Sequence, residues 1–174
     1  MRRRMRYFIL MLFTALYLYG DSVRAETEDV KTTVGRVEKV WIKEAGIVLD
    51  AKMDTGTLTS SLDAHDMHVF SKNGKVWVRF VLKNTYGKSI TLERLVVRFA
   101  RFKKQGHDVV RRPVVKLGLC IKRIFRNTEI NLSDRQRFTY PMLIGRRFLS
   151  GNVVVDTAKK YVSPPECDGV PKSN

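Results

Sequence analysis

Asp54, Thr55 and Gly56 are the residues most suited to chemistry, because they place a carboxylate at the end of a strand-like segment, residues 47–53. Two carboxyl groups held close together cannot both ionise, so such a pair keeps one proton and polarises a water molecule between them. Gly56 permits close backbone approach and unusual dihedral angles, and Thr55 supplies a hydroxyl that could tie two such loops together. Asp and Gly also dominate ordinary turns, so the surrounding chain must decide between the two interpretations.

A second motif lies far downstream, where Tyr140 to Leu149 reads as an apolar segment, a glycine, two arginines and another apolar pair. Together the two motifs resemble those of retropepsins. Residues 51–56, 60–64 and 112–115 resemble more closely a bacterial retropepsin-like family that has been called an ATP-dependent zinc protease family. The resemblance covers roughly residues 34–161. It implies a mainly β fold, a retropepsin-like closed β-barrel or acid-protease half, with one short C-terminal helix.

The resemblance also implies roles for individual residues. Asp54, Thr55 and Gly56 would form the catalytic loop. Residues 145–149 would cross beneath this loop and open the short helix, with Gly145 and Arg146 as structural residues and Arg146 in an ion pair or a dimer interface. One D-T-G motif in 174 residues implies that two chains each contribute an aspartate, as a homodimer. A later Asp-Thr pattern, in residues 153–158, lacks the glycine and is interpreted as the last strand with its exit turn.

A flap over the site is expected at Lys104, Gln105, Gly106 and His107, a polar segment with a glycine between strand-forming residues. Retropepsins place the flap shortly before the final pair of core strands, here expected at residues 114–121 and 129–132. The alternative is the hairpin at Asn73-Gly74, whose sequence suits a type I′ turn. Other strands are expected at residues 34–42, 47–53, 76–82, 90–99 and 153–155, with further turns at 44–46 and 84–88.

The N-terminus reads as an export signal. A basic segment, an apolar run over residues 7–19 and small residues up to Ala25 predict a signal peptide over 1–25. The apolar run is shorter than the roughly 20 residues that span a bilayer, so we expect cleavage near Glu26, a periplasmic location and no stable membrane span afterwards. A flexible lead-in is expected over 26–33, the domain over 34–162 and an irregular tail over 163–174.

The chain carries a net charge of +16, and +12 once residues 1–25, with their five arginines and one aspartate, are set aside. This charge favours anionic partners, such as acidic peptides or a component of the cell envelope. Nucleic acid is not expected, because the basic residues are scattered and no stacked-aromatic ribonucleoprotein motif occurs. Cys120 and Cys167 are the only cysteines. In an oxidising compartment they could form a disulfide, although two free thiols are equally compatible with the sequence.

Residues 63–68 hold His65 and His68 beside two aspartates, a conceivable zinc site. The His-Glu-x-x-His motif and the phosphate-binding Gly-x-x-x-x-Gly-Lys-Ser/Thr loop are both absent, so neither a metal nor a cofactor is expected. The favoured function is an exported homodimeric aspartic endopeptidase acting on a peptide or protein substrate. The alternative is a non-catalytic periplasmic module that binds peptide or envelope polymer on the same fold. Thr57, where retropepsins usually carry alanine, favours the alternative.

Overall fold

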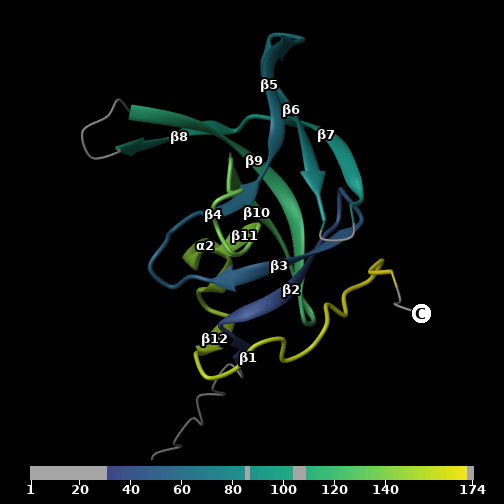
Figure 1. Cartoon of the computed structure of the whole chain (residues 1–174), viewed down its shortest axis with the longest axis vertical. Helices are drawn as coiled ribbons and strands as arrows, with labels where there is room; N and C mark the ends of the chain where they lie inside the picture. Colours follow the sequence, from purple (N-terminus) through teal and green to yellow (C-terminus); the bar gives the residue numbers. More distant parts are fainter. Residues whose placement is uncertain (1–30, 85–86, 104–108, 172–174) are drawn as a thin grey trace, which may run out of the picture.

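The computed structural model describes residues 31–84, 87–103 and 109–171. Figure 1 shows a mainly β molecule with one short helix in its described part. The elements are β1 Thr32–Gly35, β2 Val37–Ile42, β3 Ile47–Met53, β4 Ser60–Asp63, β5 His65–Lys72, β6 Lys75–Lys83, β7 Ser89–Leu95, β8 Arg98–Lys103, β9 Val109–Ile121, β10 Ile124–Ser133, β11 Met142–Ile144, α2 Arg146–Leu149 and β12 Val153–Asp156.

Six of these strands form a closed barrel. Their order is β10-β4-β11-β3-β2-β9, and pairing of β9 with β10 closes the ring. The barrel is mixed, because β11 runs parallel to β3 and β10 runs parallel to β4, whereas the other neighbours are antiparallel. This confirms the expected closed β-barrel with a short helix near its C-terminal end.

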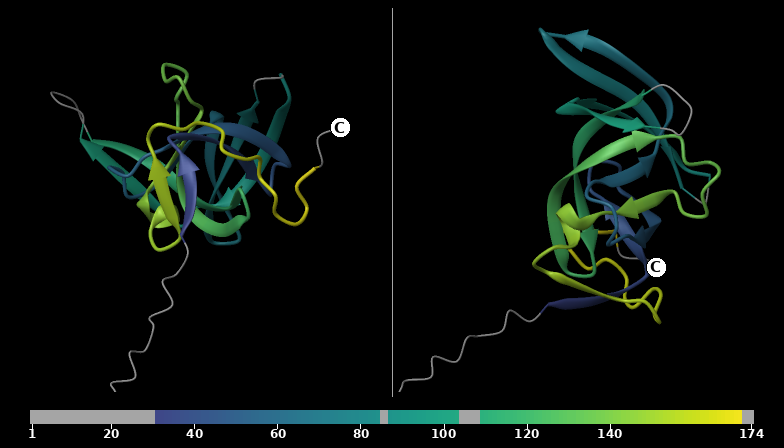
Figure 2. Two further views of the ribbon diagram at one scale, coloured as in Figure 1. Left: turned by 90° about the horizontal axis from the view of Figure 1, so that it is seen from below. Right: turned by 90° about the vertical axis from the view of Figure 1, so that its left-hand side faces the viewer.

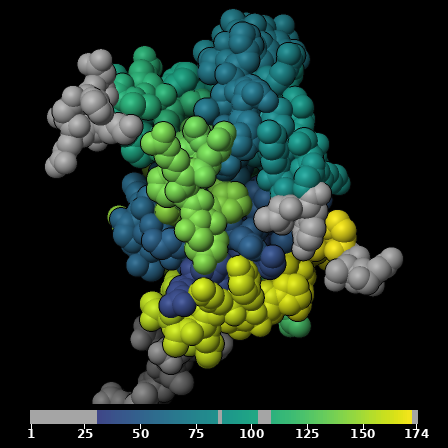
Figure 3. Space-filling model, in the orientation of Figure 1, coloured from purple at the N-terminus to yellow at the C-terminus, as the bar shows by residue number. Residues whose placement is uncertain are grey.

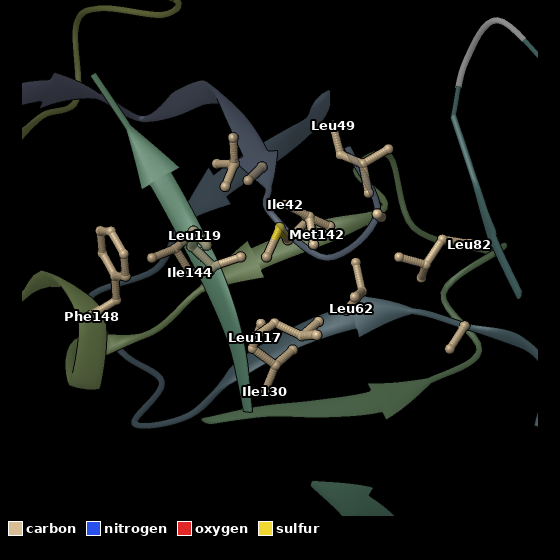
Figure 4. Packing of buried hydrophobic residues seen from close by; sticks show 14 of the residues in the cluster. Ile42, Leu49, Leu62, Leu82, Leu117, Leu119, Ile130, Met142, Ile144 and Phe148 are labelled. Carbon is tan, nitrogen blue, oxygen red and sulfur yellow. The ribbon is translucent and has the colours of Figure 1, made fainter. Parts of the chain in front are cut away.

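Apolar residues at alternate strand positions build the barrel core. In β3 the side chains of Ile47, Leu49, Ala51 and Met53 are buried, as the period of two requires. Leucine and isoleucine side chains from β4, β9, β10 and β11 meet them, and Phe148 of α2 covers one end of this cluster (Figure 4). Full burial of such a side chain contributes about 1.5–3 kcal/mol, so this core holds the strand ends of the barrel in place.

A separate three-stranded sheet, β5-β6-β7, packs against the barrel. Its inner face contributes Val78, Phe80, Leu82 and Leu92 to the shared core, while the β5–β6 hairpin projects beyond the barrel (Figures 1 and 2). The tip of this hairpin is Asn73-Gly74, with φ angles of 52° and 70°. Positive φ at both positions is the property that makes Asn-Gly suitable for a type I′ turn.

Two expected strands are each divided in the structure. The stretch expected as one strand over 34–42 breaks at Arg36 into β1, which pairs in parallel with β12, and β2, which enters the barrel. β1 begins at Thr32, so it includes the last two residues of the expected lead-in. The stretch 90–99 passes from the three-stranded sheet to the barrel sheet. The Val96 N–H donates to the carbonyl of Val76 on β6, and the next N–H, of Val97, donates to the carbonyl of Val114 on β9. Val96 and Val97 are both strand-forming residues, so local composition does not mark the second break.

The tail after β12 contains neither helix nor strand over residues 157–171 and runs along the barrel. Cys120 and Cys167 form a disulfide, with 6.1 Å between their Cα atoms, which settles the question that the sequence left open. The buried carboxylate of Glu38 also accepts a hydrogen bond from the backbone N–H of Val162, at 3.0 Å. The tail is therefore attached at several places, which also include the hydrogen bond from the Tyr161 N–H to the Val37 carbonyl. The one helix in the described part of the chain is far too short to cross a lipid bilayer.

Candidate active site

Asp54 is the first residue after β3, and the backbone around it sets the direction of its carboxylate. Its N–H donates to the Ile144 carbonyl on the neighbouring strand β11, at 2.8 Å. One carboxylate oxygen accepts the Gly56 N–H at 2.9 Å, and the other lies 3.7 Å from the Lys52 ammonium. The side chain is 20% exposed. The carboxylate is thus fixed in orientation and still open to solvent.

The Gly-Arg motif, Gly145 and Arg146, packs directly against this loop. The N–H of Arg146 donates to the Thr57 carbonyl at 2.8 Å, and its guanidinium donates to the Thr55 carbonyl at 2.8 Å. A Cβ atom on Gly145 would lie 2.8 Å from the Leu58 carbonyl oxygen, which is closer than a carbon and an oxygen can approach. The structure therefore brings Asp54, Thr55 and Gly56 together with Gly145 and Arg146. Arg146 binds a carbonyl, and no carboxylate of the described residues forms an ion pair with it.

A buried polar network supports the loop from below, and the sequence did not reveal it. The Ser60 hydroxyl accepts the Gly145 N–H at 3.1 Å, and the Asn131 side chain donates to the Ser60 carbonyl at 2.8 Å. The Ser61 hydroxyl lies within hydrogen-bond distance of Asn131 and Ser133. Buried polar groups must be paired, so these residues connect β4, β10 and the Gly-Arg motif. Their signal in the sequence is weak, since hydroxyls after a D-T-G motif also suit an exposed turn.

Glu129 on β10 joins three parts of the site. It binds the guanidinium groups of Arg98, at 2.8 Å, and of Arg147 on α2. Arg98 in turn lies 3.3 Å from the Thr59 hydroxyl, next to the catalytic loop. Desolvation raises the pKa of Glu129, but the hydrogen bonds and charges of the two arginines outweigh this effect and lower the pKa overall. This charge cluster ties the base of the β8–β9 hairpin to the loop and the helix.

The expected flap tip, Lys104 to His107, lies outside the described residues. The two strands on either side of it are described: β8 and β9 pair in antiparallel register as far as Lys103 opposite Val109. The contact between Arg98 and Thr59 places the base of this hairpin beside the catalytic loop. From there the hairpin extends away from the barrel (Figure 1). The alternative hairpin, at Asn73-Gly74, belongs to the separate sheet of β5, β6 and β7.

Arg135 is a buried charged residue in the connection before β11. It is only 8% exposed. Its guanidinium stacks over the Phe138 ring, 4.4 Å from the centroid, and donates to the Tyr140 carbonyl at 3.3 Å. Burial lowers the pKa of Arg135, and the charge of Arg112 lowers it further. The charges of Asp63 and Asp54 raise this pKa and so oppose the effect of burial. Figure 3 shows this light-green connection on the same face as the blue segment between β3 and β4.

The two histidines of the conceivable zinc site both lie on β5 and contact different side chains. His65 lies 3.1 Å from the Asp63 carboxylate and 3.2 Å from the Gln136 amide, whereas His68 stacks on Phe70 in the outer sheet. Among residues 31–84, 87–103 and 109–171, no three His, Cys, Asp or Glu side chains gather closely enough to hold a metal ion. The described residues thus do not fit the zinc ion that the older family name implies.

A protein-family comparison is consistent with this geometry. The model described as "RimB-like: Retropepsin-like aspartic endopeptidase RimB" matches residues 33–166, which include both motifs. The chain belongs to the RimB-like family. A solved Legionella pneumophila protein of unknown function is 31% identical to it, with a TM-score of 0.65, and the match covers 75% of this chain and 97% of that protein.

Curated relatives of this RimB-like chain carry a different description. Probable alpha-L-glutamate ligases from Shewanella halifaxensis and Desulfotalea psychrophila are each 26% identical to it, over 76% and 74% of this chain. A probable alpha-L-glutamate ligase from Parasynechococcus marenigrum is 28% identical over 72% of this chain. The match covers 28–30% of the length of these relatives. The similarity thus concerns a part of each ligase the size of this domain.

Proposed function

We propose that this protein is an exported aspartic endopeptidase whose active site forms between two copies of the chain. The observation that carries the proposal is the geometry at Asp54, a partly exposed carboxylate oriented by the Gly56 N–H, in a loop held by Arg146. In the described part of one chain, no second carboxylate is hydrogen-bonded to Asp54. An aspartic dyad needs two such groups, so the partner subunit supplies the second Asp54.

The chemistry follows from one proton shared by the two aspartates. The ionised carboxylate takes a proton from water as the water oxygen attacks the scissile carbonyl carbon. The protonated carboxyl group donates a hydrogen bond to the carbonyl oxygen as negative charge develops there. Protonation of the amide nitrogen then allows the C–N bond to break, and the dyad again holds one proton. An extended peptide would bind partly by strand addition, using its own backbone N–H and carbonyl groups.

Exposed apolar side chains support association through the catalytic face. Leu58 is 51% exposed on the catalytic loop, and Phe138 is 60% exposed on the connection before β11. Burial of these two side chains against a partner subunit would stabilise the dimer. β1 and β12 pair with each other within one chain, so they are already engaged before any dimer forms. We therefore place the dimer contact around the two catalytic loops.

Export to the periplasm is the proposed location, with a cleaved signal peptide and no stable membrane span afterwards. The disulfide between Cys120 and Cys167 supports it, because such bonds persist in oxidising compartments. The net charge of +12 after residues 1–25 also suits an envelope setting, where anionic components are available as partners.

The test compares residues 26–174 with the Asp54→Asn variant on a diverse peptide library, with and without a metal chelator. Asparagine keeps the shape of the side chain but cannot hold the shared proton, so we expect cleavage to survive chelation and to be lost in Asp54→Asn. The matched control is Asp66→Asn, which changes an exposed carboxylate at a positive φ of 49° that asparagine tolerates.

A mass measurement in solution on the same samples tests the dimer. Absence of cleavage from acid to neutral pH by a folded monomer would contradict the proposal. The protein would then be studied as a module that binds peptide or envelope polymer on the same fold.

A further inference from the structure

The β5–β6 hairpin carries the apolar stripe of its sheet beyond the core that buries it. At every second position of β6, the side chains of Val78, Phe80 and Leu82 are fully buried. Val76, the next residue of this stripe toward the tip, is 42% exposed, and Val69 on β5 is 44% exposed. Figures 1 and 3 show this end of the hairpin as a protrusion at the top of the molecule. One face of the projecting hairpin is therefore apolar and open.

The other face of the hairpin carries aromatic rings beside basic groups. Phe70 lies opposite Trp77 across the two strands, and both point away from the valine face, because successive side chains of a strand alternate. Both side chains are half-buried. The Lys72 ammonium lies 5.4 Å from the centroid of the Trp77 ring, and the Arg79 guanidinium lies 5.8 Å from that of Phe70. The hairpin thus presents apolar or aromatic side chains on both of its faces.

The tip of the hairpin is basic. Lys72 and Lys75 lie directly opposite each other, on the two sides of the Asn73-Gly74 turn, and like charges in this position destabilise a sheet. Lys72 lies 3.8 Å from Glu93, a carboxylate that already binds Arg79 at 2.6 Å. Lys75 forms no ion pair with any Asp or Glu of residues 31–84, 87–103 and 109–171. An anionic partner at the tip would offset this repulsion.

We propose that the β5–β6 hairpin docks on an anionic phospholipid surface, with its tip among the headgroups. This inference goes beyond the proposed peptidase function and does not depend on it. Residues 65–83 contain four Lys and Arg side chains and one aspartate, so their charge complements the phosphates of such a surface. A groove in a protein would cover one face of the hairpin, whereas the headgroup region surrounds a projecting tip and accepts apolar side chains on both faces. Aromatic rings with basic neighbours are enriched at this interface.

The first experiment measures binding to lipid vesicles by sedimentation. It uses residues 26–174, which contain every described element and lack the apolar run over 7–19 that could bind lipid by itself. The probes are vesicles of phosphatidylglycerol mixed with phosphatidylcholine, compared with vesicles of phosphatidylcholine alone. We expect at least tenfold tighter binding to the anionic vesicles at low salt. This difference should shrink as the salt concentration rises, because salt screens exposed charges.

Replacing both tip lysines tests the charge of the hairpin. The double variant Lys72→Gln and Lys75→Gln should weaken binding to the anionic vesicles by about tenfold, since each basic side chain adds to the attraction. The control is Lys83→Gln with Lys88→Gln, which removes two exposed charges from the opposite end of the same sheet. This control should stay within about twofold of the parent. If the tip variant does not fold, Lys75→Gln alone decides the matter, with an expected loss of about threefold.

A second pair of variants tests the apolar face. Val69→Thr with Val76→Thr keeps the branched shape of both side chains and makes them polar, so binding should fall by about five- to tenfold. The matched control is Val154→Thr with Val162→Thr, at valines that are 48% and 38% exposed on β12 and on the tail. The control should bind as the parent does. Circular dichroism and the melting temperature of each variant report whether its fold is retained.

The two tryptophans of the chain allow the contact to be located. Trp41 is only 4% exposed in the barrel, whereas Trp77 lies on the hairpin. On binding, the Trp77 emission should shift to shorter wavelength and be quenched by lipids with brominated acyl chains. Trp77→Phe keeps an aromatic ring, so it should still bind the anionic vesicles and lose both signals.

The inference is overturned if the protein does not prefer anionic vesicles, or if the Lys83 and Lys88 pair matters as much as the tip lysines. In the second case the net charge of the chain, and not the hairpin, would attract the lipid. It is also overturned if the hairpin valines affect the mass in solution and not the vesicle binding, because that face would then contact a second copy of the chain. Unchanged Trp77 emission in the bound protein would contradict it as well.

Discussion

Gly145→Ala tests the idea that the catalytic loop depends on close contact with the Gly-Arg motif. The added Cβ would lie 2.8 Å from the Leu58 carbonyl oxygen and 2.9 Å from that of Thr57. These are backbone atoms, and the same two carbonyls accept the N–H groups of Arg147 and Arg146. Neither the Gly-Arg backbone nor the two carbonyl groups can move apart without breaking one of these hydrogen bonds. The clash should therefore displace the loop that carries Asp54.

The expected cost can be estimated from the kind of change. The φ angle at Gly145 is −95°, which alanine adopts freely, so the penalty arises from contact alone. Overpacking of one methyl group costs about 1–3 kcal/mol. For a domain of this size, each kcal/mol lowers the melting temperature by about 2–4 °C. We expect a fall of roughly 2–12 °C and a loss of peptide cleavage larger than stability alone explains, because the aspartate is misplaced.

Thermal unfolding followed by circular dichroism, with cleavage measured well below the transition, is the assay. Gly151→Ala is the control, because Gly151 has a φ of +85° and no atom within 4 Å of an added Cβ. It should cost about 1 kcal/mol through its left-handed backbone and leave cleavage intact. A Gly145→Ala protein with unchanged melting temperature and activity would refute the close-contact argument.

Two further predictions concern stability. Replacing Cys120 and Cys167 by serine opens a loop with a sequence separation of 47, so the free energy of unfolding should fall by about 2–4 kcal/mol; an unchanged denaturant midpoint would show that the tail is held by other contacts. Arg98 and Arg147 lower the pKa of Glu129 in the folded state. The contribution of Glu129 to the free energy of unfolding is therefore present above its unfolded pKa, near 4.5, and is lost as the pH falls through the lower folded pKa. Denaturant unfolding from pH 7 to pH 3 should therefore show a smaller acid-induced loss of stability in Glu129→Gln than in the parent, and equal slopes would contradict the ion-pair assignment.

Much of the fold could be predicted from the sequence because its signals are local. The Asn73-Gly74 turn, the alternation in residues 47–53 and the apolar segments before Asp54 and Gly145 depend on the preferences of neighbouring residues. The two motifs also carried the family resemblance, and family membership is confirmed by the match over residues 33–166. Such signals require no knowledge of which distant segments meet.

Contacts between distant segments were decided only by the tertiary structure. The parallel pairing of β1 with β12 and the change of sheet at Val96–Val97 depend on partners that composition does not name. Cys120 and Cys167 could be read as a bridge or as free thiols until their Cα atoms were placed 6.1 Å apart. Arg135 reads as a solvated linker residue until the connection before β11 folds over it. Burial is a property of the whole packed chain, and for this reason the burial of Arg135 carried no signal in the sequence.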